Sequence, residues 1–192
     1  MKKTPYALLA CGLALTLSSC VIPRSYPDPQ IHQAANSKVV RLQKPLVIDL
    51  EVETQRQGKP LKGAAKYWTN WLEKSFAKTN QVTVVKNDPA AGQLHVLINN
   101  YADTKKAAAK GFGSGLTLGV VGISVSDNYD ATFNYHVSGG TSFTKTYQHA
   151  LHSLIGATAK APEGVKTTTM VAGVEQISDD FVKMFLAELA KK

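Results

Sequence analysis

Cysteine and long apolar runs are the two features that this sequence has least of. Only two of its 192 residues are cysteines, Cys11 and Cys20. Beyond the first twenty residues, no apolar run reaches the roughly 20 residues that a membrane-spanning helix needs. We therefore expect one domain that is stabilised by an ordinary hydrophobic core, without help from a disulfide framework.

The chain also lacks the short motifs that announce an enzyme or a metalloprotein. It contains no HExxH, no GxxxxGK[ST] and no GxSxG, and each of these would have placed a ligand or nucleophile by a known geometry. His149 and His152 would point to opposite faces of a strand, so they and His136 are interpreted as exposed strand histidines. The sequence predicts no catalytic residues, no metal and no cofactor.

The N-terminus holds the one strongly apolar segment, MKKTPYALLACGLALTLSSC. Two lysines precede a run of about a dozen apolar residues, which is typical of a secretory signal and too short to span a bilayer. The segment ends in LSSC, Leu17 to Cys20, which resembles the lipobox of bacterial lipoproteins. This resemblance implies cleavage before Cys20 and its acylation with palmitate-type chains, which anchor stably when there are several. The mature chain would then have no free thiol.

The residue after the cysteine concerns the address of the protein. Val21 stands where an aspartate would imply retention in the inner membrane. The resemblance therefore implies a lipid anchor in the outer membrane, with the body at the periplasmic face rather than the cell surface. We divide the chain into a signal peptide at 1–19, a lipid-anchored tether at 20–45 and a single α/β domain at 46–192.

The predicted tether is rich in proline. Four of the eight prolines of the chain fall between residues 21 and 45, and the stretch IPRSYPDPQ contains three of them. Proline cannot continue a helix or enter the interior of a sheet. We therefore expect a partly extended segment that holds the body away from the lipid, with at most a short strand around residues 38–42.

The net charge is positive, at +8 for the whole chain. Removal of Lys2 and Lys3 with the signal peptide leaves +6. A basic balance favours anionic neighbours such as lipid headgroups or cell-surface polymers, while the export signal argues against nucleic acid as a partner.

The body shows alternating strand patterns and two amphipathic helices. The expected elements are a strand at 46–54, a helix at 61–80, strands at 81–87, 93–101, 129–139 and 141–151, and a helix at 168–191. Trp68 and Trp71 lie on the apolar stripe of the first helix as core anchors, and Asp179 and Lys183 form an i,i+4 pair in the second. The predicted class is α+β, a mainly antiparallel sheet with two helices packed on one face.

This order of elements resembles the α/β domain of the TolB N-terminal region and of the curli-secretion lipoprotein CsgG. The segments that carry the resemblance are KPLVIDLEV, WTNWLEKSF, QVTVV, QLHVLIN and ISDDFVKMFLAEL. The surface-exclusion lipoprotein TraT is similar in another respect, since it too combines a lipobox with a glycine-rich apolar segment in an α/β body. These resemblances imply a non-enzymatic envelope lipoprotein.

A glycine-rich apolar insert at about 111–124 is the least ordinary part of the body. It could contact a membrane or a second copy through Gly111, Phe112, Gly113, Gly115, Leu116, Gly119 and Gly122. Gly115 and Gly119 form a GxxxG spacing, which allows close approach of helices in a membrane. Lys105, Lys106 and Lys110 precede it and could meet an anionic surface. A partly buried loop between two strands remains an equal interpretation, and SDNYD at 126–130 is interpreted as turn chemistry.

Three functions follow as hypotheses. The first is an accessory or assembly lipoprotein that binds another envelope protein or itself. The second is a binder of an anionic envelope ligand, such as a lipid headgroup or a cell-surface polymer. The third, a hydrolase, would need a pocket that joins a histidine to a carboxylate.

Overall fold

The structure is a computed structural model, and it describes residues 24–38, 40–102 and 122–192. In these ranges the chain forms three helices and a seven-stranded sheet. The elements are β1 (Arg24–Pro27), α2 (Pro29–Asn36), β2 (Leu46–Arg56), β3 (Lys59–Pro60), α3 (Ala65–Lys78), β4 (Val82–Val85), β5 (Gly92–Ala102), β6 (Ile123–His136), β7 (Ser142–Ile155) and α5 (Met170–Leu189).

The sheet is mainly antiparallel, as predicted. Its strand order is β1-β7-β6-β5-β2-β3, and β4 pairs with the first residues of β2, whereas β3 pairs with its last. Strand β2 is parallel to β4 and β5, while the other pairings are antiparallel. Strands β2 and β4 are parallel because α3 connects them as a crossover. It returns the chain to the level of the first residues of β2 before β4 begins.

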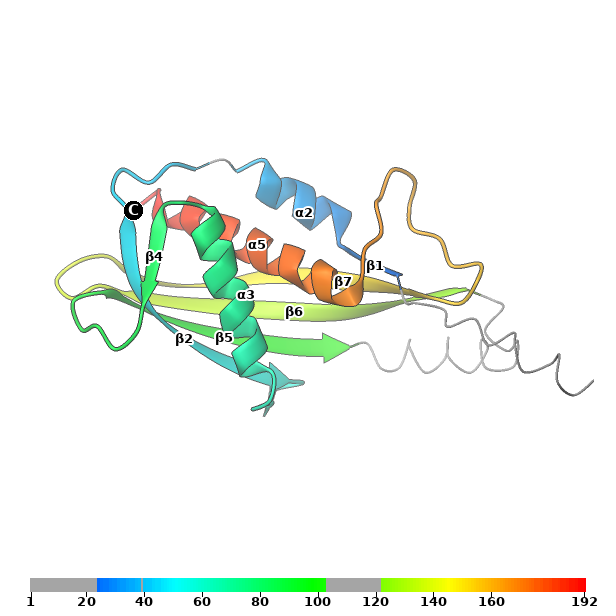
Figure 1. The fold of residues 1–192 in the computed structure, drawn as a ribbon, viewed down its shortest axis with the longest axis horizontal. Coiled ribbons are helices and arrows are strands. Elements are labelled where there is room, and N and C mark those ends of the chain that lie inside the picture. Colours follow the sequence, from blue (N-terminus) through cyan, green and yellow to red (C-terminus); the bar gives the residue numbers. More distant parts are fainter. Residues whose placement is uncertain (1–23, 39, 103–121) are drawn as a thin grey trace, which may run out of the picture.

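Helices α3 and α5 lie across one face of the sheet, which confirms the predicted packing (Figure 1). Trp68 and Leu72 of α3 and Phe181 and Phe185 of α5 are buried against it. Trp71 is only partly buried but packs on the same core. The aromatic rings interlock, and Phe185 stacks on Phe133 of β6 with ring centroids 5.3 Å apart.

The opposite face of the sheet is polar. Along β2, Ile48 and Leu50 are buried, while Glu51 and Glu53 are exposed. Period-two alternation of this kind places one set of side chains on the core and the other in water. The exposed glutamates of β2 therefore lie on the solvated face of the sheet.

The predicted tether is wrong from Arg24 to Asn36. Residues 24–27 pair with the end of β7, and residues 29–36 form a helix, α2, that packs on α5 and β1. The prolines fit because Pro27 ends β1 and Pro29 begins α2, where a missing N–H leaves no bond unmade. Arg24, the first residue of β1, lies only four positions after Cys20 in the sequence.

Three smaller expectations also differ from the structure. No strand forms among the described residues near Lys38. Strand β6 begins at Ile123, inside the predicted insert, and the stretch SDNYD belongs to it rather than to a turn. The turn interpretation failed because cross-strand partners satisfy these polar groups: the Asn100 side chain donates to the backbone oxygen of Asn128, and Tyr101 Oη donates to Asp130.

Candidate functional site

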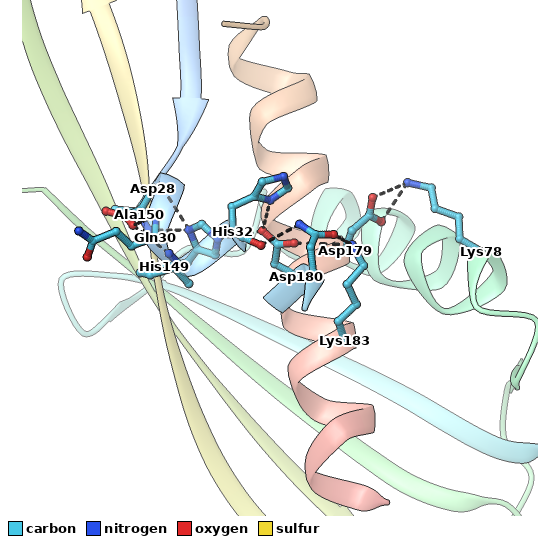
Figure 2. Close-up of polar contacts among 11 residues, drawn as sticks. Asp28, Gln30, His32, Lys78, His149, Ala150, Asp179, Asp180 and Lys183 are labelled. Carbon is cyan, nitrogen blue, oxygen red and sulfur yellow. Dashed lines mark hydrogen bonds and ion pairs between the residues drawn. The ribbon is translucent and has the colours of Figure 1, made fainter. Parts of the chain in front are cut away.

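Asp180 is the centre of a buried polar network between α2, α5 and β7. Its side chain is fully buried. One carboxylate oxygen, Oδ2, lies 2.6 Å from Nδ1 of His32 and 3.0 Å from Nε2 of His149 (Figure 2). A carboxylate taken out of water needs such partners, because burial of an unpaired charge costs several kcal/mol. Helix α2 therefore has to dock on α5 for Asp180 to obtain its contact with His32.

The surroundings of His149 fix its tautomer. Its side chain is fully buried on β7. The backbone N–H of Ala150 donates to Nδ1 at 2.9 Å, and the nearby oxygen of Ala150, 3.2 Å from Nδ1, already accepts from the N–H of Asp28. Nδ1 is therefore an acceptor, and Nε2 carries the proton that is donated to Asp180.

His32 reaches Asp180 because α2 begins at a defined point. The side chain of Asp28 caps the helix and accepts from the backbone N–H of Gln30 and Ile31 at 3.0 and 3.1 Å, as Asp does at many helix starts. His32 lies three residues before the fully buried Ala35. The two side chains therefore share the face of α2 that meets α5. The His32 side chain remains 40% exposed, so the network is open to water at α2 only.

A second set of contacts surrounds the network at the surface. Lys183 Nζ donates to Asn36 Oδ1 of α2 and lies 3.8 Å from Asp180 Oδ1. Lys78 Nζ of α3 donates to both oxygens of Asp179, at 2.8 and 2.9 Å (Figure 2). The predicted Asp179–Lys183 pair is therefore wrong, because partners on neighbouring helices compete with partners along the same helix.

A serine, a histidine and an aspartate also meet near β1. Ser126 Oγ lies 2.8 Å from Nδ1 of His152, and Nε2 of the same ring lies 3.5 Å from Asp28 Oδ2. The ring of His152 also packs against Tyr26 in a tilted arrangement, with the ring centroids 5.0 Å apart. Partial burial alone would raise the pKa of Asp28. The hydrogen bonds from Ile31, His152 and Gln30 have the larger, opposite effect, and the pKa of Asp28 lies below its usual value. The other oxygen of this carboxylate caps α2, so the group is committed to the fold.

The predicted histidine positions are partly confirmed. His136, His149 and His152 do lie in the β6–β7 hairpin, and His149 and His152 occupy opposite faces of β7. The expectation that all are exposed is wrong for His149, which is 2% exposed. Among the described residues, no three or more His, Cys, Asp or Glu side chains are arranged to hold a metal ion.

Most of the predicted contact residues lie outside the described residues: Cys20, Lys105, Lys106, Lys110, Gly111, Phe112, Gly113, Gly115, Leu116 and Gly119. Gly122 is described, and its N–H donates to Thr158 Oγ1 at 2.7 Å. A Cβ at position 122 would lie 1.9 Å from the backbone nitrogen of Ala159. Gly122 therefore allows the close approach of its own backbone to that of Ala159 in the same chain. No helix among the described residues has the length and hydropathy to cross a membrane.

Two of the surface hollows each gather three or more charged side chains. A hollow of 390 Å³ next to the Asp180 network is lined by Lys38, Lys78 and Lys183 over the apolar side chains of Val40 and Leu186. A second, of 510 Å³, brings His95 near Asp49 and Glu51 of the polar sheet face, with Lys86 beside them. Of the two, the lysine-lined hollow has the charge that an anionic ligand would require.

Sequence reasoning missed Asp180 and His32, although Asp180 left a trace in the sequence. It follows the buried Ile177 by three residues and precedes the buried Phe181, so it falls on the apolar stripe of α5. A carboxylate on such a stripe must have a buried partner. His32 left no such trace, because it lies in the segment 20–45 that the prolines predict to be a partly extended tether.

Comparison with known proteins leaves the family open. No protein-family model and no curated protein matches the chain. Rare lipoprotein B from Shewanella oneidensis aligns with 14% identity over 76% of this chain and 88% of that one, at a TM-score of 0.32. A minor lipoprotein from Acinetobacter baumannii aligns with 15% identity over 76% and 86%, at 0.33. At such scores we base no argument on these alignments.

Proposed function

We propose that the protein is a non-enzymatic lipoprotein of the outer membrane, acylated at Cys20, that acts there as an accessory or assembly component. The observation that carries the proposal is the folded N-terminal segment. Strand β1 and helix α2 are part of the body, and β1 starts four residues after Cys20. An acylated Cys20 would therefore hold the body directly at the bilayer, where it can present a fixed face to another envelope protein.

The roles of the polar clusters support a binding protein over a hydrolase. One oxygen of the Asp180 carboxylate, Oδ2, contacts both His32 and His149, and the contact with His32 docks α2. In the Ser126 cluster, the carboxylate that would orient the histidine also caps a helix. Both clusters thus have a structural task.

The anchor is tested by a change at Cys20. The variant Cys20→Ser is expected to leave the membrane fraction and appear in the soluble fraction, with an intact mass that lacks acyl chains. If it stays in the membrane fraction at the wild-type level, the lipid anchor is not what holds the protein there. Density-gradient separation of inner and outer membranes tests the address in the same preparation.

The accessory role is tested by in-cell crosslinking of the tagged, lipidated protein, followed by mass spectrometry of the captured proteins. One other envelope protein at a fixed ratio is the expected result. Capture of the chain alone would identify self-association instead. Capture of no protein at all would contradict both forms of the proposal.

The glycine-rich insert remains a predicted contact for a partner, a second copy or the membrane. The structure sharpens its test, because a deletion has to spare Gly122 and the start of β6. We expect a chain without residues 111–121 to fold but to lose its crosslinks. If the same crosslinks persist, the insert does not make the contact.

An anionic envelope ligand is a second candidate, favoured by the lysine-lined hollow beside α2. Lys38, Lys78 and Lys183 reach it from three segments, while Asp179 is its one carboxylate. Titration with a short-chain phosphatidylglycerol should shift NMR signals of the lining residues, and added salt should weaken the effect. Lys183→Gln should lower the affinity about tenfold. Binding that is insensitive to both changes would exclude this site.

A further inference from the structure

One end of the sheet gathers the segments closest to the predicted anchor. Strands β1 and β6 begin there, β7 ends there, and Arg24 pairs with Leu154. Thr168 pairs with Ser25 just before α5 begins. Figure 1 shows the loop between β7 and α5, in orange, at this end of the molecule. We call it the anchor-proximal end.

Exposed apolar side chains flank the first residues of β1 at this end. Ile155 follows Leu154, the partner of Arg24, and is 45% exposed. Met170 and Val171 follow shortly after Thr168 and are 47% and 58% exposed. Ile155, Met170 and Val171 are three of the six exposed large apolar side chains among the described residues. Such a concentration on the two segments that flank β1 is typical of an interaction surface.

The same end is basic. Arg24, Lys160 and Lys166 are exposed, and Glu163 is the one carboxylate between residues 156 and 171. The guanidinium of Arg24 donates to the backbone oxygen of Ala159 at 3.0 Å, which holds the loop against β1. Apolar side chains beside lysine and arginine are the combination that binds the interface of an anionic bilayer.

The length of chain before β1 selects the occupant of this surface. Three residues separate Cys20 from Arg24, and the four Cα–Cα steps from Cys20 to Arg24 span at most about 14 Å when fully extended. With acyl chains on Cys20, the anchor-proximal end cannot leave the headgroup region by more than that distance.

We propose that the anchor-proximal end is a docking surface for an anionic lipid bilayer. Ile155, Met170 and Val171 enter the headgroup region, and Arg24, Lys160 and Lys166 meet the lipid phosphates. The surface fixes the orientation of the body on the membrane, while the acyl chains supply most of the hold. The orientation rests on the proposed acylation of Cys20, but the affinity of the surface for lipid does not.

Depth-sensitive quenching tests the orientation. The lipidated protein, labelled with an environment-sensitive fluorophore at Ile155→Cys, is reconstituted in vesicles that contain phosphatidylglycerol and brominated lipid. Val47→Cys is a matched control, since Val47 is 43% exposed and lies at the other end of the sheet. We expect quenching at 155 and none at 47. Equal quenching, or quenching at 47 alone, would overturn the proposal, as would shielding of position 155 by a second copy without lipid.

Vesicle sedimentation tests the surface without the anchor. The unlipidated chain from residue 20, with Cys20→Ser, should bind phosphatidylglycerol vesicles better than phosphatidylcholine vesicles. Lys160→Glu with Lys166→Glu should lower the partition coefficient about tenfold or more. Lys74→Glu with Lys145→Glu makes the same change of net charge at exposed positions elsewhere and should matter much less. Equal losses in the two pairs would contradict the proposal.

The two experiments separate this proposal from the proposed function. If Cys20 carries no lipid but the unlipidated chain binds vesicles through Lys160 and Lys166, the anchor fails and the docking surface stands. If Cys20 is acylated and position 155 is not quenched, the anchor stands and the docking surface fails.

Discussion

At the scale of single residues, the buried polar groups determine where this protein is sensitive to change. Asp180 depends on two histidines from different elements, whereas its neighbour Asp179 pairs with a lysine that is 59% exposed. Two adjacent aspartates of one helix thus differ mainly in burial, and each can serve as the control for the other.

Asp180→Ala should lower the free energy of unfolding by about 3–5 kcal/mol, because it leaves a buried histidine without its partner and opens a cavity. Asp179→Ala should cost less, about 1–2 kcal/mol, because it removes a partly exposed ion pair with Lys78 and one hydrogen bond from Ser75. Urea denaturation of both variants measures the difference. Equal losses would mean that burial of the Asp180 network contributes nothing of its own.

Tyr147 offers the opposite case, a buried group whose removal should help. Its hydroxyl has no hydrogen-bond partner among the described residues, and burial, with the nearby Glu188, raises its pKa above the usual value. Tyr147→Phe should stabilise the fold by about 1 kcal/mol at neutral pH, since an unpaired buried hydroxyl is lost.

The same variant should respond differently to alkali. In the unfolded chain the Tyr147 hydroxyl has a pKa of about 10, and in the folded protein its pKa is higher. As the pH rises above about 10, the unfolded state loses this proton first, so the protein loses stability. The wild type should therefore lose stability more steeply above pH 10 than Tyr147→Phe. Thermal unfolding of both proteins between pH 8 and 11 measures this, and parallel curves would contradict it.

At the scale of elements, α2 is a short helix held by few contacts, so its docking should be separable from global folding. His32→Ala removes its contact with Asp180, while Gln33→Ala changes an exposed side chain of the same helix. Hydrogen exchange in residues 29–36 should be faster in His32→Ala only, with little change in the β6–β7 hairpin. Equal exchange in the two variants would show that His32 does not hold α2.

The elements with strong periodicity could be predicted from sequence. The alternation of β2 and the apolar stripes of α3 and α5 gave their positions, since one buried face imposes its period on the sequence. The segment 24–36 could not be predicted, because its prolines exclude helix interiors and central strands but allow strand ends and helix starts. The Asp180 network could not be predicted for the same reason, because His32 reaches Asp180 only when this segment folds back on the body.

At the scale of the whole molecule, the position of β1 decides how far from the bilayer the proposed acylation of Cys20 would hold the body. A tether of residues 20–45 would let the body move tens of Å from the lipid. With β1 beginning at Arg24, three residues lie between Cys20 and this strand. Together with the proposed acylation, the short link and the basic, apolar anchor-proximal end would give every copy the same orientation, with this end of the sheet toward the membrane.

The central claim is that the body of the acylated protein lies directly on the membrane. Neutron reflectometry of the lipidated protein on a supported bilayer that contains phosphatidylglycerol measures the protein density as a function of distance from the headgroups. We predict that this density begins at the headgroups, with no layer of solvent between. A solvent layer of tens of Å, with the protein beyond it, would contradict the account and restore the tether.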